Sequence, residues 1–143
     1  MAANFLEFAF FKRRREYAAL FIRLIIGAFI VWGVQDNVFH YPQMEEFAHF
    51  LREHGVPFPL FAAFLSAYTQ FVCGICILLG AAVRLISIPF IINFVAAIFI
   101  AHRGDNLRGM FPALLMIFVG LFFLFHGAGK PSLDEWWERR GAR

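Results

Sequence analysis

Four long runs of apolar residues limit what this 143-residue chain can fold into. The runs cover about residues 17–39, 58–82, 85–102 and 109–126. Each is close to the ~20 residues that a helix needs to cross a bilayer. Backbone N–H and C=O groups in lipid have to pair with one another, so such runs must be helical. The sequence therefore predicts an all-α fold, a transmembrane four-helix bundle that forms one membrane domain over residues 1–143.

The composition argues against a soluble protein. Hydrophobic residues make up 61% of the chain and charged residues 16%, whereas soluble domains average about 45–50% and about 25%. A net charge of +3 could suggest nucleic acid, but the basic residues gather at the ends of the apolar runs and no base-reading motif accompanies them. We therefore expect membrane lipid as a partner and no nucleic acid.

The distribution of Lys and Arg predicts the orientation. Three segments that should share one side carry nine of them: Lys12, Arg13, Arg14, Arg15, Arg84, Lys130, Arg139, Arg140 and Arg143. The opposite side has three: Arg52, Arg103 and Arg108. The positive-inside rule then predicts a multi-pass protein of the cell inner (cytoplasmic) membrane with both termini cytoplasmic. The first run is longer than a signal-peptide core, so we expect it to be retained.

Short amphipathic helices are predicted outside the four runs. Residues 1–16 combine an apolar patch with a basic end, which favours an interfacial segment. Between the first two runs, Met44, Phe47, Phe50 and Leu51 have helical spacing and predict an amphipathic helix on the surface that ends at Gly55.

The tail, residues 127–143, contains a helix start signal. Ser132 followed three residues later by Glu135 fits a capping box, so a short cytoplasmic helix should follow. It would place Trp136 and Trp137 at the membrane interface.

Small residues recur at helical spacing within the runs, as expected for helices that pack closely in lipid. The first run offers Gly27 and Gly33. The later runs offer Ser66, Thr69, Cys73, Cys76 and Gly80, then Asn93, Ala96, Ala97 and Ala101, then Gly109, Ala113, Met116 and Gly120.

Polar residues within the runs are candidates for function, because they are costly in lipid. Gln70 and Asn93 lie near the middle of the second and third runs. A very short link around Val83 and Arg84 makes these helices antiparallel neighbours, so the two side chains should lie at similar depth. They either hydrogen-bond each other or hold a polar group of a ligand, such as a quinone carbonyl.

A second candidate site lies at the outer membrane face. Gln35 and Asp36 end the first run, and His102 and Arg103 end the third. An acid, a base that titrates near neutral pH and a cation could handle a headgroup, a quinone or a proton. The alternative is ordinary solvation of helix ends with local ion pairs.

A polar cluster is also predicted at the inner face, from Arg23, Arg84, His126 and Asp134. Arg23 could extend to the headgroups, pair with Asp134 or bind an anionic substrate. Structural pairing is the favoured interpretation.

The cysteines and histidines do not indicate a metal or a covalent cofactor. Cys73 and Cys76 form a CxxC, but redox pairs usually lie at a helix N-terminus, and this one lies deep in an apolar run. Packing is therefore favoured over redox chemistry. The five His have no metal-binding spacing, and two Cys cannot hold an iron–sulfur cluster that usually needs four.

Three pieces of the chain resemble one family. The first is Arg23-Leu-Ile-Ile-Gly27, which leads to Trp32-Gly-Val-Gln-Asp-Asn37. The second is Gln70-Phe-Val-Cys-Gly74, which leads to Leu-Gly80 and then Val83-Arg84. The third is Gly127-Ala-Gly-Lys-Pro-Ser-Leu-Asp134. The last is similar to the Gly-x-Gly-[Arg/Lys]-x-Ser-Leu-Asp ending of the DoxX-like family of small four-helix membrane proteins. The resemblance extends from about residue 23 to 134.

The resemblance implies a link to membrane oxidoreductases, since the family takes its name from a subunit associated with a terminal quinol oxidase. This chain departs from the pattern in two places. Many members have Glu where it has Gln70, which cannot titrate. Near the end of the first run, many family members have His-Gly followed by a Lys, whereas this chain has Trp32-Gly33 followed by Asp36-Asn37.

The resulting expectation is an accessory subunit of a quinone-linked membrane oxidoreductase, with a quinone as its ligand. A ligand-free scaffold or assembly factor is the alternative, followed by a small-solute transporter. No catalytic set of residues is recognised in the sequence, so its own chemistry would be limited to positioning a quinone or small acid. Partners could be a larger membrane redox complex or further copies of the chain.

Overall fold

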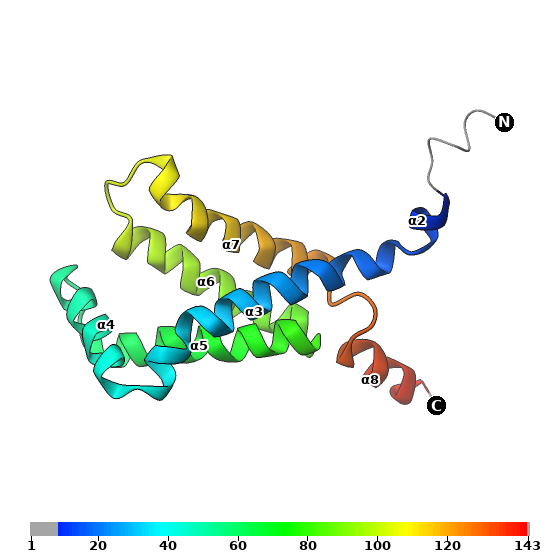
Figure 1. Cartoon of the computed structure of the whole chain (residues 1–143), viewed down its shortest axis with the longest axis horizontal. Helices are drawn as coiled ribbons and strands as arrows, with labels where there is room; N and C mark the ends of the chain where they lie inside the picture. Colours follow the sequence, from blue (N-terminus) through cyan, green and yellow to red (C-terminus); the bar gives the residue numbers. More distant parts are fainter. Residues whose placement is uncertain (1–8, 143) are drawn as a thin grey trace.

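The computed structural model describes residues 9–142, and its secondary structure is helical (Figure 1). The predicted fold class is confirmed, because four helices are long and apolar enough to cross a membrane. These are α3 (Ala18–Phe39), α5 (Pro59–Leu79), α6 (Val83–Ala101) and α7 (Leu107–His126). The shorter helices are α2 (Ala9–Arg13), the 3₁₀ helix η1 (Arg15–Tyr17), α4 (Tyr41–Glu53) and α8 (Leu133–Gly141).

The four long helices form two closely packed pairs, α3 with α5 and α6 with α7. In Figure 1 the pairs lie close together near the α5–α6 turn and spread apart toward the opposite end. We call the first the tail end, because α2 and α8 lie there. We call the second the loop end, which carries α4 and the α6–α7 loop (residues 102–106).

Glycines allow the α3–α5 pair to approach closely. A Cβ atom added at Gly27 would lie 2.7 Å from Leu78 Cγ, and one at Gly74 would lie 2.8 Å from Val31 Cγ2. Gly27 therefore packs as the sequence predicted. Gly33 does not, since a Cβ there would meet open space.

Two groups of buried residues hold the helices together. The larger one joins all four long helices and includes Ile30, Ile77, Phe90, Met116 and Phe123. The smaller one lies at the loop end, where α4 packs on α5.

The helix α4 differs from its prediction. Its apolar residues Met44, Ala48 and Leu51 are buried with Ala63 and Ala67 of α5. The helix therefore covers part of the bundle and does not simply lie on the surface. The last helical residue is Glu53 and His54 is the C-cap. Gly55 follows at φ +75°, and the Val56 N–H turns back to the Leu51 carbonyl at 3.0 Å, so Gly55 ends the helix as the sequence predicted.

The α5–α6 turn is also shifted from its predicted place. It consists of three residues, with Gly80 at φ +69° and Ala82 at φ +49°, so Val83 and Arg84 belong to the first turn of α6. The second long helix therefore ends before residue 82, and the third begins before residue 85.

The predicted tail helix is present as α8. The Ser132 hydroxyl accepts a hydrogen bond from the Glu135 N–H at 3.2 Å, so Ser132 is the N-cap. At the other end of the chain, α2 carries the exposed Phe10 and Phe11 of the predicted interfacial segment. Residues 1–8 of that segment lie outside the described part of the chain.

Candidate functional site

The most deeply buried charge of the described chain is Arg23, in the second turn of α3, with 2% of its surface exposed. Its Nε donates to the Ile77 carbonyl at 2.8 Å and its Nη2 to the Leu78 carbonyl at 2.9 Å. These carbonyls lie at the end of α5, where helical N–H donors run out, and the Ile77 carbonyl also accepts the Gly80 N–H at 3.2 Å. Arg23 therefore caps the neighbouring helix.

The same guanidinium also binds the segment after α7. Its Nη1 donates to the carbonyls of Ala128 at 3.2 Å and Pro131 at 2.7 Å. The favoured structural role of Arg23 thus fits the geometry, but its hydrogen-bond acceptors are four carbonyls and not the predicted Asp134. An anionic ligand at Arg23 would have to displace these bonds.

Asp134 instead caps α6. Its two carboxylate oxygens accept the N–H groups of Ala82 at 2.5 Å and Val83 at 3.0 Å, and its own N–H donates to the Gly80 carbonyl at 2.9 Å. A carboxylate at a helix N-terminus satisfies free N–H groups and interacts well with the helix dipole. We call Arg23, Asp134 and their backbone partners the tail lock.

An ion pair ties the start of the chain to the same segment. Lys130 Nζ lies 2.7 Å from Glu16 Oε2, and the Lys130 N–H donates to the Glu16 carbonyl at 2.9 Å. The hydrogen bond to Glu16 and the charge of Glu16 raise the pKa of Lys130. A Cβ at Gly129 would lie 2.5 Å from that carbonyl, which explains why a glycine suits this position.

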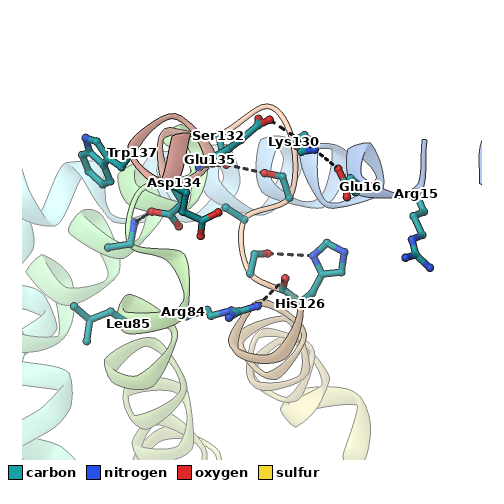
Figure 2. A pocket seen from close by; sticks show the side chains of 15 residues that line it. Arg15, Glu16, Arg84, Leu85, His126, Lys130, Ser132, Asp134, Glu135 and Trp137 are labelled. Atoms are coloured by element: carbon teal, nitrogen blue, oxygen red, sulfur yellow. Dashed lines mark hydrogen bonds and ion pairs between the residues drawn. The ribbon is translucent and has the colours of Figure 1, made fainter. Parts of the chain in front are cut away.

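A pocket of about 970 Å³ opens beside the tail lock (Figure 2). Arg84 and His126 lie on one side of it, and Lys130 with Glu16 on the other. Arg84 is exposed and makes only long bonds, from Nη2 to the carbonyls of Phe125 at 3.4 Å and His126 at 3.5 Å. Of the predicted inner cluster, Arg84, His126 and Asp134 line this pocket, Asp134 while also capping α6, whereas Arg23 is not among the lining residues.

Gln70 and Asn93 are brought together within the bundle, but through a third residue. Gln70 Nε2 donates to the Ser66 hydroxyl at 3.2 Å, and that hydroxyl donates to Asn93 Oδ1 at 2.8 Å. We call Gln70, Ser66 and Asn93 the polar chain. The sequence treated Ser66 only as a small packing residue, although its position one helical turn before Gln70 could have indicated the contact.

The predicted outer cluster is not assembled. His102 Nδ1 pairs with Asp105 at 2.8 Å within one loop, and Asp36 pairs with His40 at 3.8 Å within one helix end. Among the described residues, no hydrogen bond or ion pair joins Gln35 or Asp36 to His102 or Arg103. The two halves share a depth in the bundle but belong to different helix pairs.

The CxxC lies in the helix packing, as favoured from the sequence. Cys73 is buried and its thiol donates to the Ile86 carbonyl at 3.5 Å, while Cys76 is half-buried, and neither forms a disulfide. Within residues 9–142 no group of three or more His, Cys, Asp or Glu side chains is arranged to hold a metal ion.

Comparison with known proteins fits this architecture. The profile of the DoxX family matches residues 18–103, which cover α3 to the end of α6. The chain belongs to the DoxX family. It is also 32% identical over 129 residues to the uncharacterized membrane protein Rv3486 of Mycobacterium tuberculosis (strain ATCC 25618 / H37Rv), an alignment that covers 80% of this chain and 77% of the relative. No solved structure matches the chain.

The family match includes Arg23 and the polar chain, whereas Asp134 and the pocket residue His126 lie beyond it. The protein is thus a multi-pass DoxX-family membrane protein with four candidate spans.

Proposed function

We propose that this DoxX-family protein is an accessory subunit of a quinone-linked membrane oxidoreductase and that the polar chain holds the quinone. The proposal places both termini in the cytoplasm, following the Lys and Arg distribution. It is carried by one observation, the hydrogen-bonding groups of Asn93 that the bundle leaves unused.

The polar chain has a direction. Gln70 donates to Ser66 and Ser66 donates to Asn93 Oδ1. An amide whose oxygen accepts a bond becomes a better N–H donor, since hydrogen bonds in series polarise one another. Asn93 therefore offers two strengthened N–H donors.

These donors have no partner in the described chain. The bond from Ser66 is the one hydrogen bond that the Asn93 side chain makes among the described residues. Asn93 is half-buried near the middle of α6, where water is scarce and an unpaired donor is costly. A quinone has carbonyl oxygens that accept such bonds and an apolar body that suits lipid.

The test is the quinone content of the purified protein. Wild type and Asn93→Leu are purified in mild detergent from the same membranes, and extracted quinones are quantified by mass spectrometry. Thr69→Val is the matched control, because Thr69 is a half-buried polar residue of α5 outside the polar chain.

We expect quinone with the wild type and Thr69→Val, and several-fold less with Asn93→Leu. Equal quinone in all three, or none in any, would overturn the quinone site. The subunit role is tested in the same preparations by identifying co-eluting proteins, and a wild type that elutes without any oxidoreductase would contradict it.

A ligand-free scaffold is the second candidate. It is favoured by the tail lock, because Arg23 and Asp134 bind backbone groups of the same chain and not a ligand. In that case the Asn93 donors would bind a helix of the partner complex. Asn93→Leu would then reduce recovery of the partner protein without any quinone being found in the wild type.

Small-solute transport, the third hypothesis, receives less support. Transporters typically build their sites from broken helices at mid-depth. Each of the four long helices in the described chain is continuous.

A further inference from the structure

The pocket at the tail end contains a cation that no carboxylate of the described chain neutralises. Arg84 lies in the first turn of α6, and its contacts are the two long bonds to carbonyls at the end of α7. These use Nη2 alone. The rest of the guanidinium remains available, and its planar set of N–H groups matches phosphate oxygens.

The nearby carboxylates are largely engaged elsewhere. Asp134 accepts two backbone N–H groups, Glu16 pairs with Lys130, and Glu135 pairs with Arg139 at 2.5 Å. Glu138 also lines the pocket and is exposed. Since the pocket contains these acids, a singly charged phosphodiester fits it better than a doubly charged free phosphate.

The surroundings of Arg84 suit a lipid. Leu85 follows it on α6 and Phe125 precedes the pocket residue His126 on α7, and both are exposed apolar side chains. They lie within candidate spans, so they continue the pocket with a surface for acyl chains. Trp137 of α8 lines the pocket on the other side (Figure 2), and Trp favours the headgroup region of a membrane.

We propose that this pocket binds the phosphate of an anionic phospholipid headgroup, with Arg84 as the main ligand. His126 and Lys130 line the same pocket and add donors near it. The shared chemistry is a phosphate group, and the apolar side chains beside Arg84 select the lipid as its source. This proposal does not depend on the quinone site, because the polar chain lies in the middle of α5 and α6.

The experiment measures lipid binding to the full chain. Protein purified in mild detergent is titrated with phosphatidylglycerol or phosphatidylcholine, and bound lipid is counted by native mass spectrometry. The test variant is Arg84→Gln, whose amide can still donate to the α7 carbonyls. The matched control is Arg108→Gln, an exposed Arg in the first turn of α7 at the loop end.

We expect wild type and Arg108→Gln to prefer phosphatidylglycerol, and Arg84→Gln to bind it about tenfold more weakly, as for the loss of a charge-assisted bidentate contact. Phosphatidylcholine has the same phosphodiester but also a choline cation that Arg84 repels, so its binding should differ much less among the three proteins. Arg84→Lys keeps the charge without the planar fork, so it should bind phosphatidylglycerol with intermediate affinity. It also serves as the test variant if Arg84→Gln does not fold.

Two outcomes would overturn the proposal. Equal phosphatidylglycerol binding by Arg84→Gln, Arg84→Lys and wild type would exclude Arg84 as the ligand. Competition by millimolar inorganic phosphate as effective as that by phosphatidylglycerol would show a site for free phosphate and reject the lipid as its source.

Discussion

The two ends of the bundle use polar residues in opposite ways. At the tail end, Arg23 and Asp134 bind backbone groups that lie 51 to 108 positions away in the chain. At the loop end, His102 pairs with Asp105 and Asp36 with His40, only three or four positions apart. Both ends carry acidic and basic residues in the sequence. Only the tail end uses this polarity to join helices.

The comparison shows that a charge inside a membrane protein need not indicate a ligand site. Carbonyls at the end of a helix need donors, and an arginine can satisfy several of them at once. Within residues 9–142 the loop end has no such long-range side-chain bonds, and α4 packs there by its apolar face. We therefore expect substitutions at the tail end to affect stability more than similar substitutions at the loop end.

The strongest test of this difference is Arg23→Leu. The substitution leaves four carbonyls without their side-chain donor, and an unsatisfied buried group costs about 1–3 kcal/mol. We expect the free energy of unfolding in detergent to fall by about 3 kcal/mol or more. Arg103→Leu, at the exposed loop end, should change it by less than about 0.5 kcal/mol. Similar losses for both variants would refute the comparison.

Glycine packing gives the next largest effect. Gly27→Ala places a Cβ against Leu78 and the Gly74 carbonyl, and overpacking of this kind costs about 1–3 kcal/mol. Gly33→Ala lies toward the loop end on the same helix, where a Cβ meets open space, and should leave stability unchanged or slightly higher. Unfolding titrations of the two variants compare the halves of α3 directly. A larger loss of stability for Gly33→Ala than for Gly27→Ala would contradict the close contact of α3 with α5 at Gly27.

A smaller loss is expected for Asp134→Asn. One acceptor for the α6 N-terminus is lost and an NH₂ group faces a backbone N–H, so the cost should be about 1 kcal/mol, as for other helix caps. Asp105→Asn is the loop-end counterpart and removes a partly exposed pair, worth about 0–1 kcal/mol. Thermal unfolding midpoints should therefore fall further for Asp134→Asn. The reverse order would mean that the Asp134 cap is dispensable.

The smallest effect should come from the exposed pair of Lys130 and Glu16, and it should depend on pH. The pKa of Lys130 is raised from its ordinary value of 10.5 by Glu16. A raised lysine pKa stabilises the fold below the unfolded pKa, and this contribution is lost as pH rises through the folded pKa.

The corresponding measurement compares wild type with Glu16→Gln. The wild type should be slightly more stable at pH 7 to 9, and the difference should disappear as the pH rises through the raised pKa of Lys130, where the side chain loses its charge. Lys12→Gln tests whether removing another charge near the N-terminus changes stability as much as Glu16→Gln does. A difference between wild type and Glu16→Gln that persists at high pH would assign the contribution to packing.

The helices and their caps were predictable from sequence, because hydrophobic length and capping residues are local signals. The four long helices and the Ser132 cap followed from such signals, and Gly27 was found from spacing. Gly74 was not predicted as a packing residue, because the packing stripe of its helix was assigned to the neighbouring Cys73. The turn residue Ala82 was missed because alanine rarely adopts positive φ.

The candidate site was harder to predict, since it depends on which helices are lateral neighbours. Hydropathy gives the depth of a residue in the membrane but not its neighbours at that depth. Gln70 and Asn93 were placed at similar depth because a short turn joins their helices, but the structure connects them through Ser66 and not directly. Asp36 and His102 share a depth as well, yet they are on different helix pairs. The partners of Arg23 are backbone carbonyls, which carry no residue-specific signal at all.

The origin of the Arg23 acceptors also constrains how the protein is made. Two of its four carbonyl partners belong to Ala128 and Pro131, which are synthesised more than one hundred residues after Arg23 itself. While the chain is being synthesised, the first helix is therefore in the membrane before two of the four carbonyl partners of Arg23 have been made. The Arg23 contacts are complete only after the tail has been synthesised, and a chain that ends before residue 128 keeps only the Ile77 and Leu78 acceptors.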